Sequence, residues 1–371
     1  MCLFLNFYRF AFGPQHPASH GVLTCLLYLS NEYIVLSDMI IGYLHRGTEK
    51  LCETKKPNQN IPYFDRLDYV SIIFCEHMYV LSYEMLLNNF SCFYNSCLRI
   101  CLFELTRVFN GLLCVSCMLF DIGCMSPLLW CFEERCKILS FFELLAGSRM
   151  HVAFLTIGGV ISANAPNANF LLFSTLSLLD LLELFANNNR ICYLRLRGIG
   201  IFSFFDTSVL SISGVLARCT GLCYDLRIYN PYESYNFYSF CSWISFFGDS
   251  FDRMLLRLND MRESVSIFAA KVKNMQKQNF VGDSSIENLI YVFYILWGSL
   301  CCGISFAAIE SPKGEYNCVL FVDTGTFTRI RIRCADFVHL LILEQTIRGY
   351  LLGDLVALIG NIDCVFGSID R

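Results

Sequence analysis

The hydrophobic and polar positions of this 371-residue chain are typical of β-strands in two regions, one towards each end. Apolar runs over 22–29 and 33–36, separated by a short polar turn, predict a pair of antiparallel strands. Side chains over 315–323 and 327–333 alternate between apolar and polar and predict a second pair. The pattern therefore predicts a β-hairpin towards each end of the chain.

The middle of the chain follows the helical spacing of three and four residues. A break is predicted at 58–62, and residues 191–247 are too irregular and aromatic to assign. The predicted helices cover a segment with His45, Arg46, Glu49 and Lys50, then 65–87, 92–120, 127–145, 169–189 and 249–277. The last helix places apolar side chains on one face and basic ones, among them Arg253 and Arg257, on another. This pattern predicts a central helix bundle, and with the hairpins an α+β fold.

One stretch, residues 288–309, has no charged residue over 22 positions. That length is sufficient for a helix that spans a membrane. Against this interpretation, Gly298 and Gly303 interrupt the stretch and no cluster of lysines or arginines flanks it. A spanning helix and a buried helix are both open at this point.

Hydrophobic residues make up 55% of the chain and charged residues only 16%. A typical soluble domain is about one quarter charged, so we expect this chain either to meet a membrane or to be buried among partner proteins. The net charge is −4 and the sequence has no basic cluster. Nucleic acid is therefore not an expected partner.

Phenylalanine and cysteine are unusually frequent, with 34 and 21 residues. Both have U-rich codons, so their excess suggests the compositional bias of a small organelle genome. The residues before the loop at 13–21 are too few for a targeting segment, and we do not expect import from the cytosol.

The cysteines are scattered along the chain, and we expect most of them to be small buried hydrophobic residues. Only Cys114 and Cys117 form a C-x-x-C pair, whereas a closed metal or iron–sulfur site needs about four ligands. No glycine-rich phosphate loop follows a predicted strand. We therefore expect the chain to bind no metal, iron–sulfur cluster, flavin or nucleotide of its own.

The segment 13–21 reads GPQHPASHG and contains two histidines, His16 and His20. Proline fixes φ and glycine permits positive φ, so this segment is predicted to be a shaped loop. Imidazole gains and loses a proton near neutral pH, which suits a site of proton transfer. A tight turn with two solvated histidines is the alternative, and the loop alone does not separate the two.

A quinone headgroup has two carbonyls and takes up two protons when two electrons reduce it. A histidine and a tyrosine on opposite sides are able to donate those protons, and a carboxylate behind the histidine would hold it charged. His20, Tyr69 and Asp121 are the right residue types for these roles. Their spacing does not bring them together, because they lie on three separate predicted elements.

Ten blocks, in order between residue 12 and residue 371, carry a resemblance to a known family. They are FGPQHPASHGVL, IGYLHRGTEKL, PYFDRLDYVS, DIGCMSPLLWCFEER, GSRMH, SGVLAR, YDLR, GDSFDRMLLRLNDMRES, ESPKGE and VFGSIDR. Together they resemble the 49 kDa subunit family of respiratory complex I, which is itself related to the large subunit of nickel–iron hydrogenases. The resemblance implies a hydrogenase-large-subunit-like α+β fold, with a central helix bundle and peripheral β-hairpins.

The implied domain is a single unit over 1–371. Its parts are an N-terminal hairpin with the loop (12–40), a mainly helical core (41–277) and a C-terminal segment with a helix and a hairpin (278–371). The family has a helix and a polar loop where the uncharged stretch 288–309 lies. We therefore interpret that stretch as a buried helix.

The resemblance also implies the residues of the site. The family's quinone-site histidine, tyrosine and aspartate fall on His20, Tyr69 and Asp121. Supporting positions in the same motifs are His16, Arg46 and Arg66. The two arginines are expected to face the neighbouring iron–sulfur subunit or to support the site.

The implied activity is ubiquinone reduction within NADH:ubiquinone electron transfer coupled to proton translocation. Electrons would come from a 4Fe-4S cluster in the adjacent subunit, with FMN and NADH bound elsewhere in the complex. Expected partners are other complex I subunits, especially the terminal iron–sulfur cluster subunit, the 30 kDa-type subunit and the quinone-channel membrane subunit. The expected location is the matrix side of the mitochondrial inner membrane, peripheral to the bilayer.

Two other classes of function remain open from the sequence. The chain would be a non-catalytic scaffold if its hydrogenase-like fold served only to hold the complex together. It would be an independent integral membrane protein if residues 288–309 crossed the bilayer.

Overall fold

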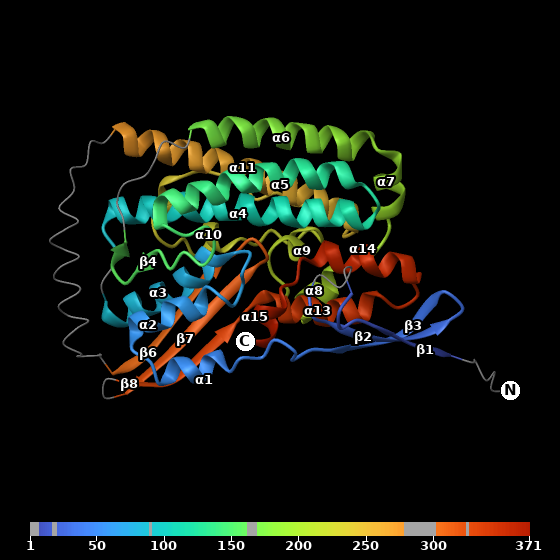
Figure 1. The fold of residues 1–371 in the computed structure, drawn as a ribbon, viewed down its shortest axis with the longest axis horizontal. Coiled ribbons are helices and arrows are strands. Elements are labelled where there is room, and N and C mark those ends of the chain that lie inside the picture. Colours follow the sequence, from blue (N-terminus) through green and yellow to red (C-terminus); the bar gives the residue numbers. More distant parts are fainter. Residues whose placement is uncertain (1–6, 17–20, 89–90, 162–168, 278–301, 324–325) are drawn as a thin grey trace.

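Long helices form a bundle on one side of the molecule, and small sheets lie on the other side (Figure 1). The computed structural model describes residues 7–16, 21–88, 91–161, 169–277, 302–323 and 326–371. The bundle consists of α4 (Phe93–Asp121), α5 (Met125–Ala146), α6 (Asn169–Asn188) and α11 (Ser250–Lys277). Each of these helices begins and ends within two residues of its prediction, so the predicted bundle helices are confirmed.

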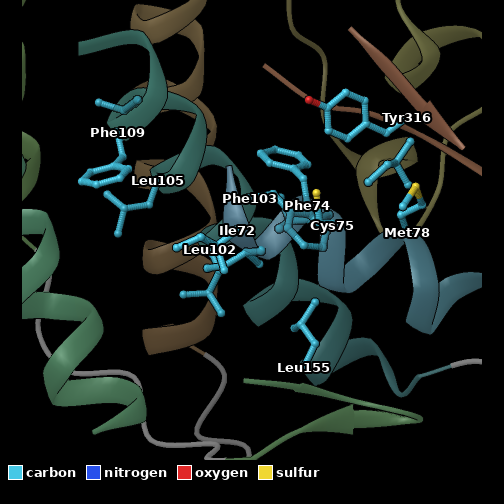
Figure 2. Close-up of a cluster of buried hydrophobic side chains, with 14 of the residues drawn as sticks. Ile72, Phe74, Cys75, Met78, Leu102, Phe103, Leu105, Phe109, Leu155 and Tyr316 are labelled. Carbon is cyan, nitrogen blue, oxygen red and sulfur yellow. The ribbon is translucent and has the colours of Figure 1, made fainter. Parts of the chain in front are cut away.

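The central helix of the bundle is α4, which packs against α5, α11 and α14 (Leu352–Ile362). Among the described residues, α4 alone is long and apolar enough to cross a membrane, yet 89% of its most apolar window is buried inside the fold. Figure 2 shows part of this core, where Phe103 of α4 meets Phe74 of α3 (Ile72–Leu87) at 5.4 Å between ring centroids. The apolar side chains of α4 therefore have partners within the chain.

The C-terminal sheet is antiparallel and has the order β6-β7-β8. Its strands are β6 (Gly303–Glu310), β7 (Glu315–Asp323) and β8 (Thr326–Arg333). The predicted hairpin is confirmed in β7 and β8, but the prediction of a helix over 303–309 is wrong, because these residues pair with β7 as a third strand. A short apolar run does not distinguish a buried strand from a buried helix. Residues 288–301 of the same predicted helix lie outside the described residues.

The N-terminal sheet has the order β1-β2-β3 and is also antiparallel. Its strands are β1 (Tyr8–Phe12), β2 (Thr24–Ser30) and β3 (Tyr33–Ile40). The predicted hairpin corresponds to β2 and β3, and β1 is an additional strand that the sequence pattern did not predict. The loop 13–21 connects β1 to β2, so both of its ends are fixed by strands.

The region between the N-terminal sheet and α4 differs from its prediction. Helix α1 (Thr48–Glu53) starts after His45 and Arg46, so these two residues do not lie on a helix. Helix α2 (Pro57–Phe64) occupies the predicted break, because Pro57 stands at its first position, where the missing N–H costs nothing. Helix α3 begins at Ile72 instead of residue 65, and Tyr69 therefore lies in a bend between α2 and α3.

Short helices and small strands fill the irregular segments. They are β4 (Leu155–Thr156), β5 (Gly159–Val160), α7 (Arg190–Leu196), α8 (Phe204–Val209), α9 (Val215–Arg218), α10 (Leu226–Tyr229) and the 3₁₀ helix η2 (Tyr235–Phe237). The chain ends with α13 (Ala335–Thr346), α14 and α15 (Phe366–Asp370). The C-terminus lies between the two larger sheets (Figure 1).

The basic side chains of α11 lie largely inside the molecule. Arg253 is fully buried and donates to the carbonyl oxygens of Gly200 at 2.9 Å and Gly248 at 3.1 Å. Lys271 is buried too, and its Nζ donates to Ser234 Oγ at 2.5 Å. The prediction of separate apolar and basic faces is therefore only partly right, because neighbouring elements cover both faces of α11.

Candidate functional site

Tyr69 lies in a bend that the neighbouring carboxylate holds in shape. Asp68 Oδ1 accepts hydrogen bonds from the backbone N–H groups of Val70 at 3.1 Å and Ser71 at 3.2 Å. These bonds compete with helical ones and delay the start of α3. Tyr69 is half-buried, and burial raises the pKa of its phenol while the Lys313 ammonium opposes that rise.

Asp68 also forms a fully buried ion pair with Lys313. Lys313 Nζ donates to both carboxylate oxygens at 2.8 Å. Burial alone would raise the pKa of Asp68, but the ammonium and the two N–H donors hold that pKa below its ordinary value. The carboxylate therefore stays ionised, and Lys313, in the turn between β6 and β7, is tied to the Tyr69 bend.

A second buried carboxyl group, Asp336 of α13, is linked to the first by a tyrosine. The Tyr316 hydroxyl lies 3.0 Å from Asp68 Oδ2 and 2.7 Å from Asp336 Oδ2. The Ser368 hydroxyl of α15 contacts the same Asp336 oxygen. Burial raises the pKa of Asp336 to about 7, although Lys313 opposes the rise. Figure 2 shows the Tyr316 ring among apolar side chains, so only its hydroxyl belongs to this polar cluster.

A third carboxyl group, on a partly buried residue, is linked to the bend through α4. Asp363, at the C-terminal end of α14, accepts a hydrogen bond from Asn110 Nδ2 at 2.7 Å. Asn110 Oδ1 in turn accepts one from Ser71 Oγ at 3.1 Å. Burial raises the pKa of Asp363 as well. Buried polar groups therefore reach the Tyr69 bend from both α4 and the C-terminal sheet.

The last helix, α15, touches both the loop and the bend. A Cβ atom on Gly21 would lie 2.5 Å from the ring of the first α15 residue, so the end of the loop packs directly on this helix. A Cβ atom on Gly367 would lie 2.5 Å from the carbonyl oxygen of Leu67. Gly21 follows His20 in the sequence, and Leu67 comes two residues before Tyr69. One short helix therefore holds together the chain positions beside two predicted site residues.

The structure describes only part of the predicted histidine loop. His20 lies outside the described residues. His16 is exposed and its ring lies 4.5 Å from that of Phe12, centroid to centroid. The loop begins at Gly13, which has a φ of +103° and whose Cβ would lie 1.9 Å from the Leu23 carbonyl oxygen, so no other residue fits there.

Asp121 lies at the C-terminal end of α4, beyond the residue of that helix which bonds the Tyr69 bend. It is the last residue of α4 and is partly exposed. Asn110, which bonds Ser71 beside the bend, stands eleven residues earlier on the same helix. Eleven residues correspond to about 16 Å along a helix axis. The structure therefore brings the loop end and the Tyr69 bend together on α15, and it places Asp121 about three helical turns along α4 from Asn110.

Arg46 and Arg66 are exposed and lie near one imidazole. The Arg46 backbone N–H donates to the Arg371 carbonyl at 3.1 Å, and Arg66 Nη1 donates to the Pro62 carbonyl at 2.5 Å. Burial, Arg66 and Arg46, in that order, lower the pKa of His151. The two guanidinium groups therefore form a cationic region close to the bend that carries Tyr69, and His151 beside them is favoured in its neutral form.

The described part of the chain contains no group of three or more His, Cys, Asp or Glu side chains suited to a metal ion. Cys114 is buried and Cys117 is partly exposed on α4. Burial raises the pKa of the Cys114 thiol far above its ordinary value. The Cys114 thiol is therefore a poor metal ligand as it stands.

Comparison with known proteins connects this geometry to a family. Residues 121–371 match the family described as respiratory-chain NADH dehydrogenase, 49 Kd subunit. The chain is 48% identical to the NADH-ubiquinone oxidoreductase 49 kDa subunit homolog of Trypanosoma brucei brucei, over 100% of this chain and 99% of that protein. The chain belongs to the 49 kDa subunit family of the respiratory-chain NADH dehydrogenase.

Two further members show the breadth of the likeness. The NADH-ubiquinone oxidoreductase 49 kDa subunit of Paramecium tetraurelia is 41% identical over 97% of this chain and 98% of its own length. The protein of the same name from Prototheca wickerhamii is 40% identical over 97% of this chain and 96% of its own length. The 49 kDa family motifs quoted above include Asp68 and Tyr69 in PYFDRLDYVS, Lys313 in ESPKGE and Ser368 in VFGSIDR.

Sequence reasoning on this 49 kDa family member missed the buried carboxyl cluster behind Tyr69. Asp68 is next to the predicted site residue Tyr69. Because a helix was predicted over 65–87, no bend was expected there for Asp68 to stabilise. Lys313 stands between Pro312 and Gly314, which predicts a turn and gives no sign of burial. Asp336 follows Arg333 by three residues, a spacing typical of an exposed charge pair, so nothing in the sequence indicated its burial.

Proposed function

We propose that this chain forms the ubiquinone-reduction site of complex I together with an adjacent iron–sulfur subunit. Tyr69 and His20 bind opposite carbonyls of the quinone headgroup, and each donates one proton. The contact of α15 with both Gly21 and Leu67 carries the proposal, because it places the chain beside His20 next to the bend of Tyr69. Membership of the 49 kDa family supports the same assignment.

The two proton donors balance the reduction. Two electrons come from the 4Fe-4S cluster of the neighbouring subunit, and the O–H bond of Tyr69 and an N–H bond of the His20 imidazolium supply the two protons. The products are a quinol, a tyrosinate and a neutral imidazole. Asp121 holds His20 charged before reduction, and its freed carboxylate begins the conformational signal to the proton-translocating subunits.

The cationic region of Arg46 and Arg66 faces the cluster-bearing subunit in this proposal. It lies on the surface beside the bend, so a subunit bound there would bring its cluster close to Tyr69. Cationic side chains near a reducible cluster stabilise its reduced, more negative form. The arginines thus favour electron arrival without binding quinone.

The remaining assignments follow from the same proposal. The chain is a peripheral-arm subunit on the matrix side of the mitochondrial inner membrane and keeps a hydrogenase-large-subunit-like fold. FMN and NADH bind elsewhere in the complex, and this chain holds no cofactor of its own. Its neighbours include the iron–sulfur subunit, the 30 kDa-type subunit and the quinone-channel membrane subunit.

The substitution Tyr69→Phe tests the proposal because it removes only a hydroxyl. We expect the complex to assemble and to reduce an artificial acceptor upstream of the site, such as ferricyanide, at the parent rate. Ubiquinone turnover should fall by about 10²-fold, the usual scale for loss of a positioned proton donor. Tyr63→Phe is the matched control, since Tyr63 is partly buried on α2 and outside the site. A Tyr69→Phe complex that reduces ubiquinone at the parent rate would favour the scaffold function instead.

A further inference from the structure

Two cysteine thiols from distant parts of the sequence meet at one end of the helix bundle. The sulfur atoms of Cys124 and Cys192 lie 3.9 Å apart, although the residues are 68 positions apart in the chain. Cys124 stands in the turn between α4 and α5, and Cys192 lies in the first turn of α7, at the end of the bundle where α6 also ends (Figure 1). The fold therefore brings together two nucleophilic side chains that the proposed function does not use.

The main chain fixes the position of each thiol. The Cys124 N–H donates to the Leu119 carbonyl oxygen at 2.9 Å. The Cys192 N–H donates at 3.3 Å to the side-chain oxygen of Asn189, the residue that caps α7. The two sulfurs therefore face each other from positions that hydrogen bonds hold in place.

Two thiols at this separation suit a disulfide better than a metal site. A closed metal site needs about four ligands, and the part of the chain that the structure describes contains no suitable group of even three. A disulfide needs only the two sulfurs, bonded at about 2.05 Å. The sulfurs would therefore have to approach each other by about 2 Å from their present separation.

The turn that carries Cys124 has room for this approach. Cys124 precedes the first residue of α5 and has a φ of −94° and a ψ of 94°, so it is outside the helical hydrogen-bond pattern. Its neighbour Gly123 is exposed, and a Cβ atom there would meet nothing within 4 Å. The turn is therefore able to shift towards α7 when a bond forms.

The different exposure of the two thiols sets the order in which they react. Cys124 is partly exposed, whereas Cys192 is fully buried within the hydrophobic core of the bundle. Burial also raises the pKa of the Cys192 thiol to about 12, so this thiol stays protonated at rest. A small oxidant from solvent therefore meets the Cys124 sulfur first, and Cys192 is placed to react with the oxidised product.

We propose that Cys124 and Cys192 form a reversible disulfide after a peroxide has oxidised Cys124. The Cys124 sulfur attacks one oxygen of hydrogen peroxide, the O–O bond breaks, and the departing hydroxide takes the thiol proton to become water. The product is a sulfenic acid, which condenses with a thiol. The Cys192 sulfur attacks the Cys124 sulfur, the S–O bond breaks, and the hydroxyl leaves with the Cys192 proton as a second water. Two thiols are oxidised to one disulfide, and one peroxide is reduced to two waters.

The bond would tie the beginning of α5 to α7. Cys124 comes three residues after Asp121, the last residue of α4, so the cross-link would hold the turn that follows this predicted site residue. It would also close the chain between positions 124 and 192 into a loop, which restricts the unfolded chain. The inference stands on the two thiols and does not depend on the quinone assignment.

Peptide mapping of the assembled complex tests this inference. The complex is treated with increasing hydrogen peroxide until the exposed thiol of Cys136 is oxidised, and the remaining thiols are blocked with N-ethylmaleimide before digestion with trypsin. Cys124 lies on the peptide 108–135 and Cys192 on the peptide 191–195. We expect the two peptides to be joined, with a mass two hydrogens below their sum and fragment ions that place the bond at Cys124. Dithiothreitol should separate them.

Three variants of the same complex sharpen the test. Cys124→Ser and Cys192→Ser should each abolish the joined peptide, whereas Cys136→Ser, which removes the exposed thiol on α5, should keep it at the parent level. Peroxide that oxidises Cys136 while Cys124 and Cys192 both stay free would overturn the proposal. A sulfinic acid on Cys124 beside a free Cys192 would overturn it too. If a serine variant does not assemble, the joined peptide of the parent complex decides the question.

Discussion

At the scale of single residues, buried ion pairs join segments that are distant in the sequence. Arg99 of α4 is fully buried and donates to Glu84 at 2.6 and 3.0 Å and to Glu233 at 2.7 Å. It also donates to the carbonyl oxygens of Thr156 and Gly159, which belong to the small β4–β5 hairpin. One guanidinium thus ties α3, α4 and two connecting segments together.

Arg99→Met should destabilise this chain strongly. Removing the guanidinium leaves two carboxylates buried without their cation, which costs about 3–5 kcal/mol. Arg149→Met is the matched control, because Arg149 and Glu143 are each more than half exposed and 3.5 Å apart, so its effect should stay below about 1 kcal/mol. Urea unfolding of the subunit measures both. Equal losses in the two variants would contradict the structural role given to Arg99.

Contacts between individual residues were the part of the structure that the sequence predicted least well. His20, Tyr69 and Asp121 were found through their types and motifs, and their joint action stays a prediction. Asp68 and Lys313 are 245 residues apart, and neither hydrophobic periodicity nor local charge pairing predicts such a contact. A charged residue is ordinarily expected at the surface, so burial of the pair became visible only in the fold.

At the scale of elements, α15 determines how the loop and the Tyr69 bend meet. Gly367→Ala would place a methyl group 2.5 Å from the Leu67 carbonyl oxygen and push the helix and the bend apart. We expect ubiquinone turnover to fall by about tenfold or more, since displacements of this size are costly at a reaction site. Ferricyanide reduction upstream should not change.

A second glycine near the C-terminus provides the control. Gly353 lies in α14, and its Cβ would have only an ordinary contact, 3.7 Å from Arg195 Nη2. Gly353→Ala should therefore keep the parent turnover. If both variants behave like the parent, α15 does not set the geometry of the site.

Elements were predicted well where one period extends over many residues. The four bundle helices and the strands β2, β3, β7 and β8 appear close to their predicted places. The predicted boundaries and types of elements were wrong where a specific hydrogen-bonding interaction outweighs the hydrophobic periodicity of the sequence. Asp68 bonds the N–H groups of the bend and postpones α3, and β6 forms because its backbone pairs with β7.

At the scale of the whole molecule, buried carboxyl groups of both kinds make stability depend on pH. Burial raises the pKa of Asp65 to about 6 and that of Glu310 to about 8. Asp225 and Glu233, although also buried, have pKa values held far below normal by arginines. The first kind stabilises the fold only while protonated and the second only while ionised.

Stability should therefore peak in mildly acidic solution. Unfolded carboxyl groups titrate near pH 4, so the contributions of Asp65 and Glu310 are full below that pH and are lost as pH rises to about 8. Those of Asp225 and Glu233 are full above about pH 4 and are lost as pH falls further. Urea midpoints of the subunit should be highest at about pH 4 to 5, and Glu310→Gln should flatten the alkaline side. A midpoint that rises steadily from pH 5 to 8 would contradict these assignments.

The α+β class was predictable because the bundle helices follow the helical spacing of three and four residues, whereas the hairpin strands show strand-like hydrophobic patterns. The arrangement of the parts was not, because the packing of α15 between the histidine loop and the bend depends on contacts between the two ends of the chain. Motifs identified the family, and the structure added the buried cluster behind Tyr69.

Photoaffinity labelling of the assembled complex tests the central claim most directly. A ubiquinone with a photoreactive headgroup, activated with and without excess unlabelled ubiquinone, is followed by trypsin digestion and mass spectrometry. Tyr69 lies on the tryptic peptide 67–99 and His20 on the peptide 10–46. A quinone held between the two residues should label both peptides, and excess ubiquinone should prevent the labelling. Labelling that excess ubiquinone prevents but that misses both peptides would contradict a quinone site on this chain.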